Sequence, residues 1–299
     1  MASALAEAGL PCVVQRVERL TGGVSNLTYR VDRDDGAPVV VRVQRTRGIF
    51  EPYNVVREAR VLQALAPTTV PVPRVLAVQE QSDALATPFF VMEFIDAPHM
   101  GQIRRSERVL DVYVRTVAAI HAVDWRSAGL EFLDPPSPGP AAAQRDLERV
   151  RVRASAHGCG DDPFIVELGV WLETHLPETT ALTLCQGDIN VYNYLFAGET
   201  VVAVVDWEEA QIADRLSDLG LLAALSYLLG AQEPPEQMPL IARYAAATGA
   251  GLEALPYFVL AALHKLAVVH RIWSEESGGS PWYAWEALAR AVALVGAAP

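Results

Sequence analysis

Apolar and polar residues alternate along the first part of the chain, between residues 13 and 43, and two turns rich in Gly, Asp and Pro interrupt the alternation. A period of two is typical of β-strands with one buried face. From Asn54 to Leu65 the apolar residues recur at helical spacing instead, and Val75–Val78 and Phe89–Ile95 have the composition of strands. The pattern therefore predicts a small antiparallel sheet with one amphipathic helix.

Beyond about residue 100 the periodicity becomes that of long helices. One exception lies inside this part, where the β-rich runs Tyr192–Phe196 and Thr200–Val205 flank the turn Ala197-Gly198-Glu199 and predict a hairpin. We therefore expect an α+β fold with a first lobe over residues 1–95 and a mainly helical second lobe over residues 96–299. The predicted helices are Glu107–Val123, Ala141–Ala156, Asp162–His175, Leu216–Leu229, Gln237–Thr248, Leu255–Trp273 and Trp282–Val295.

Composition and charge exclude several classes of partner. The 299 residues carry a net charge of −12, which leaves no broad basic surface for a nucleic acid. Three cysteines without paired spacing favour a reducing cytoplasm over a disulfide framework, and the N-terminus has no secretory signal. The longest apolar runs are short or are interrupted by His264 and Lys265, so we expect no membrane segment. The pattern does not indicate an oligomeric state.

Three polar residues around the predicted hairpin have the spacing that phosphoryl transfer needs. Asp188 precedes the hairpin, Asn193 follows five residues later, and Asp206 ends the returning strand. A carboxylate near the attacking hydroxyl and oxygen ligands for magnesium are the groups on which this chemistry depends. Each residue alone is explained by an ordinary turn, whereas their order and the hairpin together favour a metal and phosphate site whose three side chains meet at one edge.

The same segments resemble a known family. Gln186-Gly187-Asp188 through Asn193, and Asp206-Trp207-Glu208, are similar to the HGDxxxxN and IDWE motifs of the aminoglycoside phosphotransferase and choline kinase superfamily, above all the branch fused to some acyl-CoA dehydrogenases. The resemblance implies a bilobal protein-kinase-like fold, ATP or GTP and Mg²⁺ as cofactors, and a small-molecule hydroxyl as acceptor. It implies that Asp188 is the catalytic base, that Asn193 and Asp206 bind the metal, and that Asp218 braces the catalytic loop.

Two positions depart from the family pattern. Gln186 stands where the family usually has His, and Arg42 stands where kinases place a phosphate-binding Lys. Arginine can still contact phosphates and pair with Glu58 on the predicted helix, although a surface ion pair is the alternative interpretation. These departures keep a second hypothesis open, a nucleotide-binding pseudokinase with a regulatory role. No DFG sequence follows the hairpin, which disfavours a protein kinase.

The nucleotide side of the site is expected in the first lobe. The small residues between the first two strands could cover phosphates, although an ordinary hairpin turn explains them as well, and the end of the last strand could contact an adenine edge through its backbone. The candidate residues are Gly22, Gly23, Ser25, Asn26, Arg42, Glu58, Glu93, Phe94 and Ile95.

The acceptor side is expected after the hairpin and on the late helices, from Glu208, Glu209, Asp214, Trp273 and Glu276. Acidic and aromatic side chains would suit a cationic aminoglycoside, but helix surfaces and cores carry both routinely. The resemblance points instead to a hydroxylated acyl compound or another small metabolite, and both classes stay open. The histidines, His121 among them, lack metal-binding spacing, so packing explains them and we assign them no role.

Overall fold

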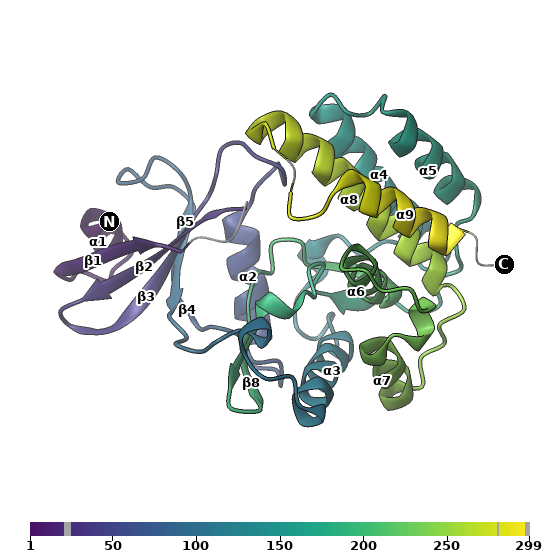
Figure 1. Cartoon of the computed structure of the whole chain (residues 1–299). Helices are drawn as coiled ribbons and strands as arrows, with labels where there is room; N and C mark the ends of the chain where they lie inside the picture. The colour runs from purple at the N-terminus through teal and green to yellow at the C-terminus, as the bar shows by residue number, and fades with distance from the viewer. Residues whose placement is uncertain (21–24, 280, 297–299) are drawn as a thin grey trace. The chain divides into compact units, whose positions relative to one another are not determined.

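The computed structural model describes residues 1–20, 25–279 and 281–296, and Figure 1 shows their helices and strands. The chain divides into two compact units. Unit 1 comprises Met1–Arg104 and Val191–Glu208, and unit 2 comprises Arg105–Asn190 and Glu209–Pro299. The predicted division into a nucleotide-binding lobe of residues 1–95 and a catalytic lobe of residues 96–299 concerns function, and it stays a prediction.

Unit 1 contains a five-stranded antiparallel sheet in the order β1-β2-β3-β5-β4. Strands that are adjacent in the sequence pair with each other, with one exception. After β3 the chain passes through α2 to the edge strand β4, and β5 then returns between β4 and β3. The predicted small sheet with one following helix is confirmed. The elements are β1 (Val14–Arg19), β2 (Leu27–Arg33), β3 (Gly36–Val43), α2 (Val55–Leu65), β4 (Val75–Gln79) and β5 (Phe89–Glu93).

Strand β3 is buried on both faces, and this arrangement fixes where its side chains point. Val39, Val41 and Val43 pack with Ala4 and Leu5 in one apolar cluster. Ala4 and Leu5 lie on α1 (Ala2–Glu7), a short helix that the sequence pattern does not predict because six residues give less than two turns of periodicity. The alternating residues of β3, Arg42 among them, face the other way.

Helix α2 begins at a well-formed cap. The side chain of Asn54 accepts a hydrogen bond from the backbone N–H of Arg57 at 2.8 Å, and Glu58 lies in the first turn. An amide oxygen at this position satisfies one of the free N–H groups of the helix start. The apolar face of α2 packs beside β4 and β5, which places Glu58 near the sheet.

The hairpin of β7 (Tyr194–Ala197) and β8 (Thr200–Val204) is confirmed, and it belongs to unit 1. Its outer edges carry hydrogen bonds to residues far away in the sequence: the N–H of Phe196 donates to Pro98 at 2.8 Å, and the N–H of Val204 donates to Pro71 at 2.8 Å. These contacts explain why a segment from the second half of the chain clusters with the first 104 residues.

Unit 2 is mainly helical, as predicted. The sequence pattern misses one small feature here, the pairing of β6 (Thr183–Cys185) with β9 (Gln211–Ala213), because three-residue strands are too short to show a period. The helices are α3 (Glu107–His121), α4 (Pro140–Ala156), α5 (Pro163–Thr174), α6 (Leu216–Leu228), α7 (Pro239–Thr248), α8 (Leu255–Ser277) and α9 (Trp285–Gly296).

Helix α8 is the centre of unit 2. It packs against α4, α5, α6 and α9, and it runs beside α9 in Figure 1. Residues Leu255–Glu276 are long and apolar enough to span a membrane by length and composition, so the interruption by His264 and Lys265 is weaker than expected. However, 78% of its most apolar window is buried in the structure, as in the core helix of a globular protein.

The close approach of α6 and α8 depends on Gly220, because a Cβ atom there would lie 2.5 Å from the backbone carbonyl of Phe258. We expect Gly220→Ala to lower the free energy of unfolding by about 1–3 kcal/mol, since the two backbones would have to separate. Gly296→Ala is the matched helical control, because its Cβ would meet open space. Urea unfolding measures the free energy of unfolding of both variants. Equal losses for the two would mean that Gly220 is not needed for the close approach of α6 and α8.

Candidate active site

The guanidinium of Arg42 is the centre of the polar site in unit 1. Its Nε donates to Glu58 Oε2 at 2.7 Å, its Nη2 donates to Asp206 Oδ1 at 2.8 Å, and Nη1 donates to Thr28 Oγ1 at 3.1 Å. Arg42 is 7% exposed and Glu58 is 2% exposed. The predicted pairing of Arg42 with Glu58 is confirmed, and the alternative of a surface ion pair is wrong.

Glu208 extends this network to the loop after β1. Its Oε2 accepts from Asn26 Nδ2 at 3.0 Å and from the hydroxyl of Ser25, and it lies 3.4 Å from Nη2 of Arg42. Two of the predicted phosphate-covering residues therefore contact the network directly. The other two, Gly22 and Gly23, lie outside the described residues.

Among the described contacts, the Arg42 guanidinium faces three carboxylates, and the guanidinium of Arg57 donates to the backbone carbonyl of Glu208 nearby. Burial raises the pKa of Glu58, and the charge of Asp206 raises it further, against the opposing effect of Arg42. Burial likewise raises the pKa of Glu208, and Asp206 again adds to it. Burial would lower the pKa of Arg42, but the carboxylates outweigh it and the pKa is raised. Such a site favours an additional cation with oxygen ligands.

The hairpin brings Asn193 and Asp206 to the same end. The N–H of Val205 donates to the carbonyl of Asn193 at 2.9 Å, directly beyond the pairing of Tyr194 with Val204. Asp206 itself has a positive φ of 63°, a conformation that Asp tolerates better than most residues. This turn leaves the strand direction and aims the carboxylate at Arg42.

In unit 2 the segment that follows β6 is held by Asp218 of α6. The backbone N–H of Gln186 donates to Asp218 Oδ2, and that of Gly187 donates to Oδ1, both at 2.9 Å. Gly187 has a positive φ of 81°, and a Cβ there would lie 2.2 Å from the carbonyl oxygen of Glu209. Only glycine fits this position, and the predicted contact of Asp218 with the catalytic loop is confirmed.

Asp188 follows this braced turn directly. Its Oδ1 accepts from Asn190 Nδ2 at 2.8 Å, and the hydroxyl of Tyr113 donates to the carbonyl of Ile189. Its loop is therefore fixed on both sides within unit 2. The expectation that Asp188 shares one edge with Asn193 and Asp206 stays a prediction.

The carboxylates expected to recognise the acceptor have partners in the protein. Glu209 pairs with Arg153 at 3.0 Å and with Lys265 at 2.8 Å, and despite its burial these cations lower its pKa well below the usual range. Asp214 caps α6 by accepting from the N–H of Leu216. Glu276 lies 3.8 Å from Nδ1 of His157, and Trp273 is half-buried on α8. Their role toward an acceptor stays a prediction.

The segment expected to contact a nucleotide base begins at the end of β5. Glu93 pairs with Val39 across the sheet, and its Oε1 accepts from the N–H of Arg74 at 2.9 Å. Phe94 stacks under the guanidinium of Arg30, 4.4 Å from the ring centre. The strand ends at Glu93, two residues before the predicted boundary at Ile95.

Sequence reasoning misses the side chains that support the site from behind. Arg153 and Lys265 neutralise Glu209, while His121 hydrogen-bonds Asp218 and Tyr113 reaches the catalytic loop. A signal existed for the last two residues, because Tyr113 and His121 are eight positions apart and lie on the same buried face of α3. The ion pairs of Glu209 join three distant segments and leave no such pattern.

The buried charge network gives a prediction about stability. Arg42→Met should lower the free energy of unfolding by about 3–5 kcal/mol, because it leaves Glu58 buried without its cation. The double variant with Glu58→Leu should cost less than the sum of the two single variants. Chemical denaturation measures the cycle.

The matched control is Arg151→Met, which breaks an exposed pair with Glu173 whose oxygen lies at 2.6 Å. It should cost less than about 1 kcal/mol, since solvent screens exposed pairs. Equal losses for Arg42→Met and Arg151→Met would mean that burial of the Arg42 network contributes nothing.

Solved structures of phosphotransferases have the same fold as this chain. A thermostable mutant of aminoglycoside phosphotransferase APH(4)-Ia in ternary complex with AMP-PNP and hygromycin B superposes with a TM-score of 0.64 at 18% identity, over 99% of this chain and 98% of that one. Macrolide 2'-phosphotransferase type I gives a TM-score of 0.63 at 20% identity, over 100% and 96%. These likenesses confirm the predicted kinase-like α+β fold.

Among curated proteins, acyl-CoA dehydrogenase family member 10 of Mus musculus is 29% identical over 223 residues. The match covers 71% of this chain but only 20% of that relative, so the chain spans about a fifth of its length. The family model of the phosphotransferase enzyme family matches residues 16–258, which include the Arg42 network and the Asp218-braced loop. The chain belongs to the phosphotransferase enzyme family.

Proposed function

We propose that this chain is an ATP-dependent phosphotransferase that moves the γ-phosphate to a hydroxyl group of a small molecule. The observation that carries the proposal is the buried contact of Arg42 with both Glu58 and Asp206. In kinases a cation on the third strand pairs with a glutamate on the following helix, and the pair positions the nucleotide phosphates. Here β3 and α2 supply that pair.

Nucleotide use is supported by the solved relative that binds AMP-PNP together with hygromycin B. In this chain the Arg42 guanidinium has a planar fork suited to phosphate oxygens. Ser25 and Asn26 lie beside it, and they would approach the phosphates from the loop between β1 and β2.

Magnesium fits the residues at the end of the hairpin. Asn193 and Asp206 offer an amide and a carboxylate oxygen, the ligand types that Mg²⁺ prefers, and Glu58 and Glu208 add further carboxylates around Arg42. When bound, the ion would neutralise charge on the phosphate oxygens. Glu208, which bonds Ser25 and Asn26, would keep the phosphate loop attached to the same segment.

Asp188 is the proposed base. Its loop is held by Asp218, and Asn190 donates to Oδ1 of its carboxylate, so the carboxylate is kept in a defined orientation. In phosphoryl transfer this carboxylate orients the hydroxyl and accepts its proton. A carboxylate on a rigid loop loses little orientation entropy when substrate binds.

The two departures from the family motif do not remove these contacts. Arg42 reaches Glu58 as a lysine would, and the backbone N–H of Gln186 is bound to Asp218. This supports a catalytic protein over a pseudokinase. The acceptor remains one of two classes: the ion pairs of Glu209 with Arg153 and Lys265 would oppose its use for a cationic aminoglycoside, whereas a hydroxylated acyl compound or other metabolite needs no free carboxylate there.

Nucleotide binding should be visible without an acceptor. Magnesium-ATP should raise the melting temperature, because a ligand at a hundred times its Kd stabilises the folded state by about 2.7 kcal/mol. Asp206→Ala should abolish the magnesium-dependent part of this rise. Asp35→Ala, which removes a half-exposed partner of Arg33 in the same unit, is the control and should keep it. No shift with millimolar nucleotide would sink the proposal.

Phosphate transfer is tested with a panel of aminoglycosides, hydroxy acids, hydroxyacyl-CoA thioesters and amino alcohols, read by the mass gain of one phosphate. Asp188→Asn should keep the nucleotide-induced thermal shift and lower turnover by about 10²–10⁴-fold, the usual worth of a general base. Asp124→Asn, an exposed turn residue of the same unit, should leave turnover unchanged. Binding of nucleotide without transfer to any acceptor would favour the pseudokinase hypothesis.

A further inference from the structure

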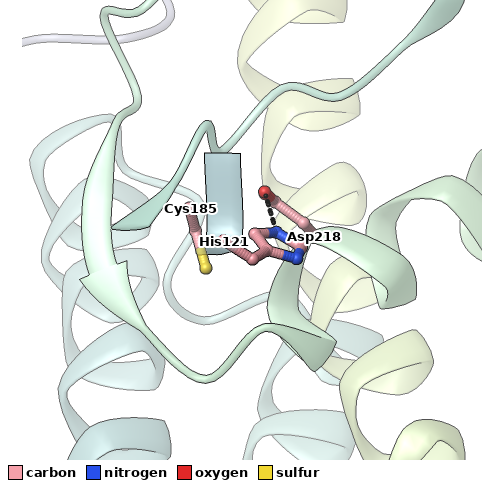
Figure 2. Close-up of side chains that lie close together, drawn as sticks. All are labelled: His121, Cys185 and Asp218. Atoms are coloured by element: carbon pink, nitrogen blue, oxygen red, sulfur yellow. Dashed lines mark hydrogen bonds and ion pairs between the residues drawn. The ribbon is translucent and has the colours of Figure 1, made fainter. Parts of the chain in front are cut away.

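Behind the candidate catalytic loop, unit 2 contains a fully buried cluster of His121, Cys185 and Asp218. Figure 2 shows the three side chains together, with the imidazole joined to the Asp218 carboxylate by a dashed line. His121 is the last residue of α3, Cys185 ends β6, and Asp218 lies in the first turn of α6. Titratable groups in the core are rare unless they are paired, so this cluster requires an explanation.

The hydrogen bonds through the cluster have a definite direction. His121 Nε2 lies 3.0 Å from Asp218 Oδ2, and the two carboxylate oxygens also accept the N–H groups of Gln186 and Gly187. A carboxylate only accepts, so Nε2 of His121 carries the hydrogen. In the neutral ring Nδ1 is then an acceptor.

Tyr244 of α7 supplies the matching donor. Its hydroxyl lies 2.7 Å from Nδ1 of His121, and burial raises the pKa of this phenol to about 12, so the hydrogen stays on the oxygen. Tyr244 is 1% exposed. Tyr244 therefore donates to His121 and His121 donates to Asp218, which also accepts from the backbone N–H groups of the loop.

A metal ion would not suit this cluster. Burial raises the pKa of the Cys185 thiol well above its ordinary value, and the thiol donates to the backbone carbonyl of Asp214 at 3.3 Å. Both oxygens of Asp218 already accept backbone hydrogens from the loop. A metal would have to displace contacts that hold residues 186 and 187.

We propose that His121 is a positioning residue for the candidate catalytic loop. By donating to Asp218 Oδ2 it fixes the carboxylate that receives the N–H groups of Gln186 and Gly187, and thereby the turn from which Asp188 projects. The consequence for catalysis rests on the proposed function. The positioning of the loop by His121 does not depend on the proposed function, because it concerns only the hydrogen bonds of two backbone amides.

The test compares hydrogen exchange of the full chain and its variants, read at the amides of Gln186 and Gly187. His121→Phe keeps a ring but removes the donor, and it should speed exchange at these two amides by roughly tenfold relative to amides in the core of α8, since a buried hydrogen bond is lost. His121→Gln places a side-chain N–H near the same carboxylate and should restore most of the protection.

The matched control is His264→Phe. His264 is equally buried, and its Nε2 lies 3.1 Å from the carbonyl of Ile165 rather than near Asp218. This variant should leave the ratio of loop to core exchange unchanged. If His121→Phe does not fold, Tyr244→Phe removes the hydroxyl that fixes the ring and should speed exchange at the same two amides.

Unchanged exchange at Gln186 and Gly187 in a folded His121→Phe variant, or in Tyr244→Phe when it is the one available, would overturn the inference. Where the wild type transfers phosphate, His121→Phe should also lower kcat with little change in the KM for nucleotide, and His121→Gln should recover it. A wild type that transfers no phosphate would count against the proposed function alone, because the exchange result does not depend on turnover.

Discussion

The structure of unit 1 depends on one buried cation. Arg42 lies on a strand and contacts one carboxylate on a helix and two on a segment from the second half of the chain, and each of these acids would be costly to bury alone. The folded unit therefore needs both the cation and the acids, because removing either one leaves a buried charge without a partner. At the hairpin end, Asp206 has the left-handed backbone that aims it at the guanidinium.

The second organising element is a carboxylate that binds backbone rather than side chains. Asp218 holds two consecutive N–H groups of the candidate catalytic loop, and this contact is available to any residue at position 186 that has a backbone N–H. This explains how glutamine can replace the usual histidine without loss of the loop contact. Gly187, by contrast, has no freedom, because Glu209 lies against it and its φ is positive.

Much of this arrangement follows from the sequence, and what does not follow has a physical reason. The strands, α2 and the hairpin have clear periods, and the order of Asp188, Asn193 and Asp206 predicts phosphotransferase chemistry. Helix α1 and the β6–β9 pair are too short to show a period. The ion pairs of Glu209 join residues 56 positions apart and leave no local pattern. The helical period shows that His121 lies on the buried face of α3, but it does not show that the partner is Asp218, 97 positions away.

The return of the chain to unit 1 also bears on how the protein is made. Arg42 and Asp206 are 164 positions apart, and a ribosome that adds about 5–20 residues per second needs roughly 8–33 seconds to supply the second after the first. Until then the nascent sheet holds a guanidinium with Glu58 as its only acid from this network. A fragment that ends at Arg104 likewise lacks Asp206 and Glu208. The first unit can therefore form all the ion pairs of Arg42 only after most of the chain has emerged.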